Sequence, residues 1–286
     1  MRRYLLLCIS LLFSIPTLFA QNDKSLLWEI SGKGITKPSY IFGTIHIVCA
    51  SDLVITDNLK TAFNKSEQLY LELDMDDPDM LLQMMQHMTM KEGTTLKSLL
   101  SDADYTMVST FFQKKTGMSI DMLGAAKPFF IMNLILPSTM NCQTASWETS
   151  LLSLAQERKI ETYGLETLQD QLAVIDQISY KDQASMLLET LKDTSQSQKE
   201  NQKLINLYKD QDIDGMQKAI STASQATSRY ERILLTDRNN RWIPLITKIA
   251  IERPTFFAVG AGHLGGKKGV IQLLRKAGYQ VKPVKL

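Results

Sequence analysis

The stretch Ser39–Ile47 reads SYIFGTIHI, in which apolar and β-branched residues lead into a glycine and then a histidine. Residues of these types favour strands, so we expect a short buried strand that ends near Gly43. In open α/β sheets, ligands bind just beyond the carboxyl ends of the strands. Gly43 permits close approach of backbone or ligand, and His46 brings a side chain that titrates near neutral pH.

The same pattern recurs near the other end of the chain, where residues 254–263 read PTFFAVGAGH. A strand-like run again ends at a glycine, Gly260, and His263 follows three residues later. The chain has three histidines, and two of them occur in this setting. The matched contexts predict that His46 and His263 belong to one shared site.

The glycines of the second motif, Gly260, Gly262 and Gly265, formally match the G-x-G-x-x-G pattern of dinucleotide-binding turns. Such a site needs an acidic residue about twenty positions later to hold the ribose, and no Asp or Glu follows Glu252. We therefore interpret the turn as a support for His263 whose backbone N–H groups are available to an anion or oxyanion.

The first twenty residues have the pattern of a secretory signal, with Arg2 and Arg3 before a short apolar stretch and Ala20 at its end. Cleavage there predicts a protein of the periplasm or cell surface without a transmembrane span, and retention as an N-terminal anchor is the alternative. Without residues 1–20 the chain has 30 basic and 30 acidic residues, a balance that argues against nucleic-acid binding.

Residues 21–286 are long enough for a single α/β domain with an ample core. Hydrophobic patterns predict a central mixed β-sheet flanked by helices, with a large helical insertion made of segments at about 77–158 and 167–250. The predicted strands are 26–30, the stretch around Gly43, 68–74, 159–163, 254–259 and 279–284.

Three charged residues beside predicted strands or helices are candidates for the site. Glu72 lies in the predicted strand 68–74, where a buried carboxylate is costly unless a cation or hydrogen-bond donor meets it. Glu166 follows strand 159–163 and precedes a helix, so it either joins the site or favours the helix dipole. Arg238 is the candidate cation, with a surface salt bridge as the alternative.

Two further features concern sulfur. Cys49 and Cys142 remain after signal cleavage, and an even pair in an exported protein predicts a disulfide, with zinc ligation as the alternative. The methionine-rich segment 80–90, which also holds His87, suggests either a Cu(I) site or an adaptable apolar helix face over the substrate, and its helical spacing favours the second. Its predicted helix begins at Asp77-Pro78.

Two imidazoles and one or two carboxylates form a nitrogen and oxygen donor set for a divalent metal such as Zn, Mn or Co, held by His46, Glu72 and His263. A metal with an open position activates water and polarises a carbonyl, which is hydrolytic chemistry. Glu166 would then take the proton, and Arg238 or turn amides would meet the oxyanion. The absence of H-E-x-x-H and G-x-S-x-G motifs disfavours zincins and serine hydrolases.

These motifs resemble the TraB/PrgY/GumN family, which includes the TIKI proteases, over nearly the whole chain after the signal. The resemblance rests on the two G-x-x-H motifs, the Glu72 strand, and the segments 164–172, 238–242, 260–263 and 278–279. It implies an α/β fold related to erythromycin-esterase-like and ChaN-like proteins. It also implies metal-dependent peptidase activity, with His46, Glu72 and His263 essential and Glu166 and Arg238 in support.

Two other functions are compatible with the same fold. The first is capture of a peptide, haem or metal-containing ligand without catalysis, and the second is hydrolysis of a small ester or lactone. A metal-dependent peptidase remains the main prediction.

Overall fold

The structure is a computed structural model that describes residues 24–140, 142–192, 194–222 and 225–286. The predicted signal, residues 1–20, lies outside these ranges. None of the helices within them is long and apolar enough to cross a membrane.

The described residues form a six-stranded sheet in the order β6-β4-β7-β2-β1-β8. Strands β6, β4, β7 and β2 run parallel, whereas β1 pairs antiparallel with β2 and with β8. The bounds are β1 (Leu27–Gly32), β2 (Ile35–Thr44), β4 (Gln68–Leu71), β6 (Glu161–Gly164), β7 (Thr255–Gly260) and β8 (Gln280–Val284). The predicted mixed sheet is confirmed, and the four parallel strands end at one edge.

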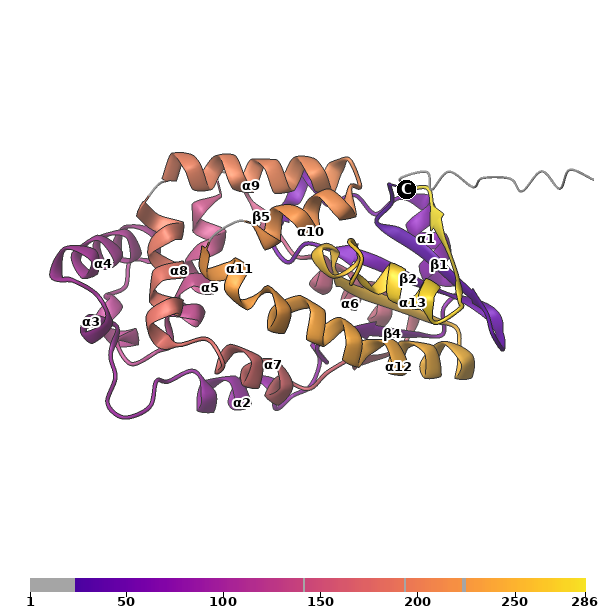
Figure 1. Ribbon diagram of the computed structural model, residues 1–286, viewed down its shortest axis with the longest axis horizontal. Helices are drawn as coiled ribbons and strands as arrows, with labels where there is room; N and C mark the ends of the chain where they lie inside the picture. Colours follow the sequence, from indigo (N-terminus) through magenta and orange to yellow (C-terminus); the bar gives the residue numbers. More distant parts are fainter. Residues whose placement is uncertain (1–23, 141, 193, 223–224) are drawn as a thin grey trace, which may run out of the picture.

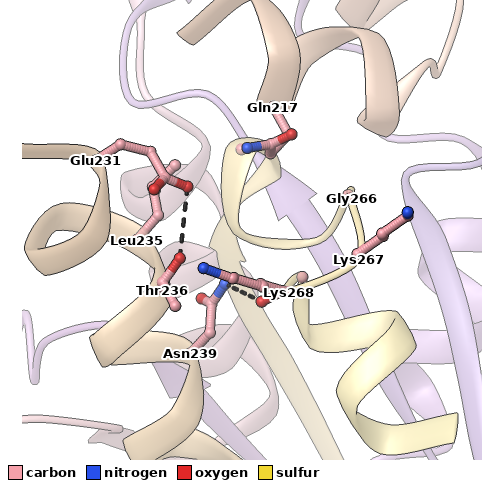
Figure 2. Close-up of a pocket in the computed structure, with 11 residues that line it drawn as sticks. Gln217, Glu231, Leu235, Thr236, Asn239, Gly266, Lys267 and Lys268 are labelled. Carbon is pink, nitrogen blue, oxygen red and sulfur yellow. Dashed lines mark hydrogen bonds between the residues drawn. The ribbon is translucent and has the colours of Figure 1, made fainter. Parts of the chain in front are cut away.

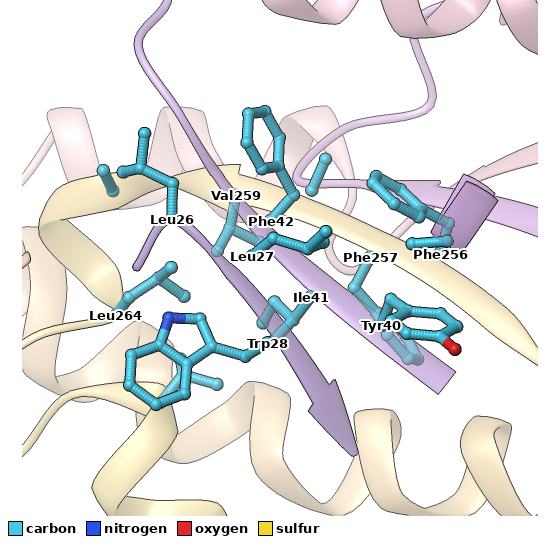
Figure 3. Packing of buried hydrophobic residues seen from close by; sticks show 14 of the residues in the cluster. Leu26, Leu27, Trp28, Tyr40, Ile41, Phe42, Phe256, Phe257, Val259 and Leu264 are labelled. Carbon is cyan, nitrogen blue, oxygen red and sulfur yellow. The ribbon is translucent and has the colours of Figure 1, made fainter. Parts of the chain in front are cut away.

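Helices cover both faces of this sheet. On one face Phe42 packs edge-on against Trp147 of α6, and Phe256 against Phe63 of α1. On the opposite face Trp28 lies under the guanidinium of Arg275 in α13, and Figure 3 shows the core residues of the central strands between these layers. The core therefore fixes the strands whose ends carry the predicted site.

Helices α3, α4, α5 and α8 extend the molecule away from the sheet (Figure 1). Parts of α3, α4, α5 and α8 share a second apolar core built on Val108, Phe112, Ile131 and Leu187. These helices lie in the predicted helical insertion between β4 and β7. The helix bounds are α1 (Asp57–Asn64), α2 (Met80–His87), α3 (Leu96–Leu99), α4 (Asp102–Thr116), α5 (Pro128–Thr139), α6 (Trp147–Arg158), α7 (Leu168–Ile175), α8 (Tyr180–Lys192), α9 (Thr194–Lys209), α10 (Ile213–Ser221), α11 (Gln225–Glu231), α12 (Asp237–Glu252) and α13 (Val270–Lys276).

Two predicted boundaries next to the site differ most from the structure. The strand predicted to reach residue 74 ends at Leu71, because β6 stops pairing with it at Gly164. Helix α2 begins at Met80 rather than at Asp77-Pro78, since the Asp77 carboxylate accepts a hydrogen bond from the Asp79 amide and forms a local turn there. Both shifts leave residues 72–79 as a loop beyond the sheet edge.

A small two-stranded sheet lies beside the first motif. It pairs β3 (Val48–Cys49) antiparallel with β5 (Thr144–Ala145). The predicted disulfide between Cys49 and Cys142 is present, with the two Cα atoms 5.6 Å apart. The cystine and the small sheet thus tie the loop after His46 to the start of α6.

Candidate active site

The carboxyl end of β7 is the point where the two histidine motifs meet. A Cβ atom placed on Gly260 would lie 3.3 Å from Glu72 Oε1, 3.6 Å from His263 Cδ2 and 4.0 Å from His46 Nε2. The Gly260 amide donates a hydrogen bond to Glu72 Oε1 at 2.8 Å. Residues from the ends of three adjacent strands therefore converge around this glycine, as the two motifs predicted.

Arg238 lies between the two acidic candidates. Its Nη2 donates to Glu72 Oε2 at 2.5 Å, and its Nε donates to Glu166 Oε1 at 2.9 Å. All three side chains are at least 89% buried. Burial alone would raise the pKa of Glu72, but the positive charge of Arg238, together with the neighbouring histidines and the Gly260 amide, outweighs it and holds that pKa well below its usual value. Glu72 is therefore a carboxylate at neutral pH.

The start of α12 brings Arg238 to the sheet edge. A π-helical turn, Arg232–Thr236, runs directly into this helix, and such wide turns are frequent at functional sites. Arg238 Nη1 bonds the Leu234 carbonyl within that turn at 3.2 Å. The guanidinium also lies 4.8 Å from the ring centroid of Trp242, one helical turn further on. These contacts fix the guanidinium between the two glutamates.

His263 is neutral, and one of its tautomers is favoured. Burial lowers the pKa of His263 to about 3. The amide nitrogen of Asn239 donates to the carbonyls of His263 and Lys268, so its oxygen is the acceptor that meets His263 Nδ1 at 2.6 Å. Figure 2 shows Asn239 and its hydrogen bond to the turn that follows β7. The lone pair of His263 Nε2 therefore faces inward, 3.1 Å from Arg238 Nη1.

His46 is held from the other side of the site by Glu148, near the start of α6. Its Nδ1 lies 2.9 Å from Glu148 Oε1, which also accepts a hydrogen bond from the Thr44 hydroxyl at 2.8 Å. The side chain of His46 is 66% exposed, whereas that of His263 is 5% exposed. The hydrogen bond to Glu148 raises the pKa of His46 to about 9. Both histidines thus place Nδ1 against an oxygen acceptor.

With this geometry established, comparison with known proteins identifies the family. The model of the TraB/PrgY/gumN family matches residues 26–283. The chain belongs to the TraB/PrgY/gumN family. The resemblance carried by the two G-x-x-H motifs is therefore confirmed, and no solved structure matches the chain significantly.

Several curated relatives from this family are named metalloproteases. Metalloprotease TIKI1 of Danio rerio is 26% identical over 92% of this chain and 64% of its own length. Metalloprotease TIKI2 of the same species is 24% identical over 92% and 62%, and human Metalloprotease TIKI1 is 26% identical over 90% and 61%. The chain thus spans somewhat less than two thirds of the length of these relatives.

The names of the relatives imply a metal, and the donor chemistry of the site fits one. A histidine that binds a metal usually presents one ring nitrogen to the ion while its other nitrogen bonds an oxygen. His46 and His263 both place Nδ1 against an oxygen in this way. Glu72 Oε1 lies 3.8 Å from His263 Nε2. Within the described ranges, however, no three His, Cys, Asp or Glu side chains are gathered as a preformed metal-binding group. The donors are of the right kind, but they are not assembled around one point.

The remaining predicted residues have structural roles around these donors. A Cβ on Gly43 would lie 2.9 Å from Leu264 Cδ1, so this glycine lets the turn after β7 pack on β2. Gly262 is buried in that turn, where a Cβ would lie 2.5 Å from Ile220 Cδ1. Glu166 faces inward and accepts hydrogen bonds from Arg238 and from the Trp242 indole, so it does not merely favour a helix dipole.

Two residues of the site, Glu148 and Asn239, are not predicted from the sequence. Glu148 lies 102 residues from its partner His46, and its only sequence signal is its position just after Cys142 and the helix cap Ser146. Asn239 adjoins Arg238 within the motif that carries the family resemblance, but nothing in its type indicates a bond to His263. Both residues act through a histidine, and both require the fold to reach it.

Proposed function

We propose that the protein is an exported metal-dependent hydrolase, a peptidase of the TIKI type that acts in the periplasm or at the cell surface. The observation that carries this proposal is the convergence of His46, Glu72 and His263 around Gly260. Each histidine directs Nδ1 to an oxygen acceptor, which leaves its Nε2 for a ligand. The metalloprotease names of the relatives favour a peptide substrate.

His46, Glu72 and His263 would hold a divalent Mn, Co or Zn ion. Such an ion, when bound, supplies Lewis acidity that activates a water and polarises a carbonyl. Glu148 and Asn239 orient the two imidazoles, and Asn239 also fixes the tautomer of His263. These oriented donors are the contribution of this chain to the reaction.

Arg238 and Glu166 support the site rather than meet the substrate. Every nitrogen of the Arg238 guanidinium already faces Glu72, Glu166, His263 or the Leu234 carbonyl. Arg238 therefore sets the position and charge of Glu72. Glu166 in turn pairs with Arg238. Because this pair is buried, Glu166 is disfavoured as the catalytic base.

Capture of a ligand without catalysis is the second candidate. It is favoured by the position of Arg238, whose cation bonds Glu72 and faces the His263 lone pair that a metal would need. A peptide, haem or metal-containing ligand would then bind at the same edge without turnover. Hydrolysis of a small ester or lactone is a further outcome that the assay below distinguishes.

The test is a metal titration with matched histidine variants. The purified protein is assayed for bound metal and for cleavage of a peptide library with added Mn, Co or Zn. His46→Ala and His263→Ala should each lower kcat/KM by at least about a hundredfold. His87→Ala, which removes the third histidine from the exposed surface of α2, should change kcat/KM less than about twofold.

The other outcomes are informative. Haem binding seen as a Soret band, with no cleavage at any metal concentration, would replace the peptidase with the binding function. Turnover of aryl esters or lactones but no peptide would indicate an esterase. Sequencing the amino terminus of the exported protein tests the predicted cleavage after Ala20.

A further inference from the structure

A cavity of about 480 Å³ opens beside the site, beyond the carboxyl ends of β4 and β6. It shares Glu166 with the site, and its walls come from the loop after β4, from α2 and from the first turn of α7. Helices α2 and α7 lie against each other along one side of the molecule (Figure 1). A substrate peptide bound across Gly260 would therefore lie next to this cavity.

The charges that line the cavity are all negative. Asp74, Asp77 and Asp170 contribute carboxylates, and no Lys, Arg or His is among the lining residues. Asp77 and Asp170 each accept backbone hydrogen bonds, from Asp79 and Thr167 respectively. The fourth carboxylate, Glu166, is paired with Arg238. The cavity thus has an unbalanced negative charge.

Asp74 supplies the observation that points to a ligand. Its Oδ1 is buried and accepts no hydrogen bond from the described residues, while burial and the neighbouring Asp76 carboxyl raise the pKa of Asp74 to about 6. A buried acceptor without a donor costs about 1 to 3 kcal/mol, so such atoms are rare unless a ligand or water completes them. A cationic group that binds the Asp74 carboxylate would balance the negative charge of the cavity.

The remaining walls suit a long side chain with a charged end. Tyr70 and Tyr163 stack with ring centroids 4.9 Å apart and planes 27° apart, and both line the cavity. Leu73 and Met80 add apolar surface, and methionine adapts readily to different shapes. Aromatic faces attract guanidinium groups, and the aliphatic stem of arginine packs on apolar walls.

We propose that this cavity is a specificity subsite that binds an arginine or lysine side chain of the substrate peptide, with Asp74 as the residue that pairs with its charge. The stem lies along Tyr70 and Tyr163, and the charged end reaches the Asp74 carboxylate. Arginine is preferred over lysine because its planar guanidinium stacks on the tyrosine wall and binds a carboxylate through two N–H groups. This inference rests on the proposed function, since it names the substrate class of that same site.

The first experiment changes the ligand rather than the protein. Two peptides that are cleaved by the protein are made identical except that one arginine is replaced by citrulline, which keeps the shape and loses the charge. The subsite predicts that kcat/KM for the arginine peptide is about tenfold higher. Equal rates for the arginine and citrulline peptides at every position would overturn the subsite and leave the peptidase intact.

The second experiment changes the protein. Asp74→Asn should remove the preference for arginine over citrulline, and Asp74→Arg should favour a peptide with glutamate at that position. Asp210→Asn is the matched control, because it makes the same change in net charge in the exposed turn between α9 and α10, away from the cavity (Figure 1). A preference that survives Asp74→Asn would assign the recognition elsewhere.

A binding measurement separates this proposal from the proposed function. N-acetyl-arginine amide and N-acetyl-citrulline amide are titrated into the protein in chelator and followed by NMR chemical shifts. Tighter binding of the arginine compound, lost in Asp74→Asn, would support the subsite even if no peptide were cleaved. Binding that is equally weak for both compounds in wild-type protein would overturn it, whatever the hydrolytic activity.

Discussion

The two halves of the site are built in opposite ways. On one side Glu72, Glu166, Arg238 and His263 form a buried network in which the charged groups satisfy one another. On the other side His46 is largely exposed and depends on Glu148, which the small sheet and the cystine bring into place. From this difference we expect the buried half to determine stability and the exposed half to tolerate change with little effect on folding.

The largest effect is expected from the buried half. Arg238→Met removes the cation between two buried carboxylates, and breaking such a network costs about 4 kcal/mol in the free energy of unfolding. Urea denaturation followed by circular dichroism measures this loss. The network would also lose the charge that keeps Glu72 ionised, so any peptidase activity should fall with it.

Arg241→Met is the matched control for this prediction. Arg241 also approaches Glu166, with Nη2 3.6 Å from Oε2, but its side chain is 48% exposed. Exposed pairs contribute about 1 kcal/mol or less, so this variant should remain close to wild type. Similar losses for the two variants would mean that the buried network does not determine stability.

Much of the fold and the buried half was predictable from sequence, because local patterns carry the information. The strand-then-glycine pattern marks β2 and β7, and parallel strands bring their carboxyl ends to one edge, so His46 and His263 had to approach each other. Glu72 was recognisable because a carboxylate beside a core strand needs a partner. That partner, Arg238, was identifiable only as a candidate cation.

The exposed half was not predictable, because its contacts depend on loops that cross long distances in sequence. Glu148 reaches His46 only after β3 and β5 pair, and neither of these two-residue strands has a periodic signal. The predicted start of α2 was wrong for a related reason. The Asp77 side chain forms a turn of its own, and such local bonds compete with helix caps of similar sequence.

An intermediate effect is expected in the exposed half. Glu148→Gln keeps the shape of the side chain but removes the negative charge beside His46, which weakens the orientation of the imidazole. Loss of such a partner typically lowers activity or metal affinity about 10- to 100-fold. Metal-supplemented peptide cleavage and metal titration measure it, and the free energy of unfolding should change by less than about 1 kcal/mol.

Glu157→Gln on the same helix is its control, since Glu157 lies on the exposed surface of α6, two turns beyond Glu148. It should leave both activity and metal affinity unchanged. If Glu148→Gln instead destabilised the fold as much as Arg238→Met, the contrast between the two halves would be lost.

The smallest effect concerns pH in the metal-free protein. The folded pKa of His46, about 9, is above the ordinary value of 6.5 because of its hydrogen bond to Glu148. The stabilisation from this bond is therefore fully present below pH 6.5 and is lost as the pH rises through about 9. Because the ring is largely exposed, the loss of stability should be small.

Urea titrations in chelator should show the wild type losing stability between pH 6.5 and about 9, and Glu148→Gln losing less. Parallel curves for the two proteins would show that the charge of Glu148 does not hold His46 in its protonated form.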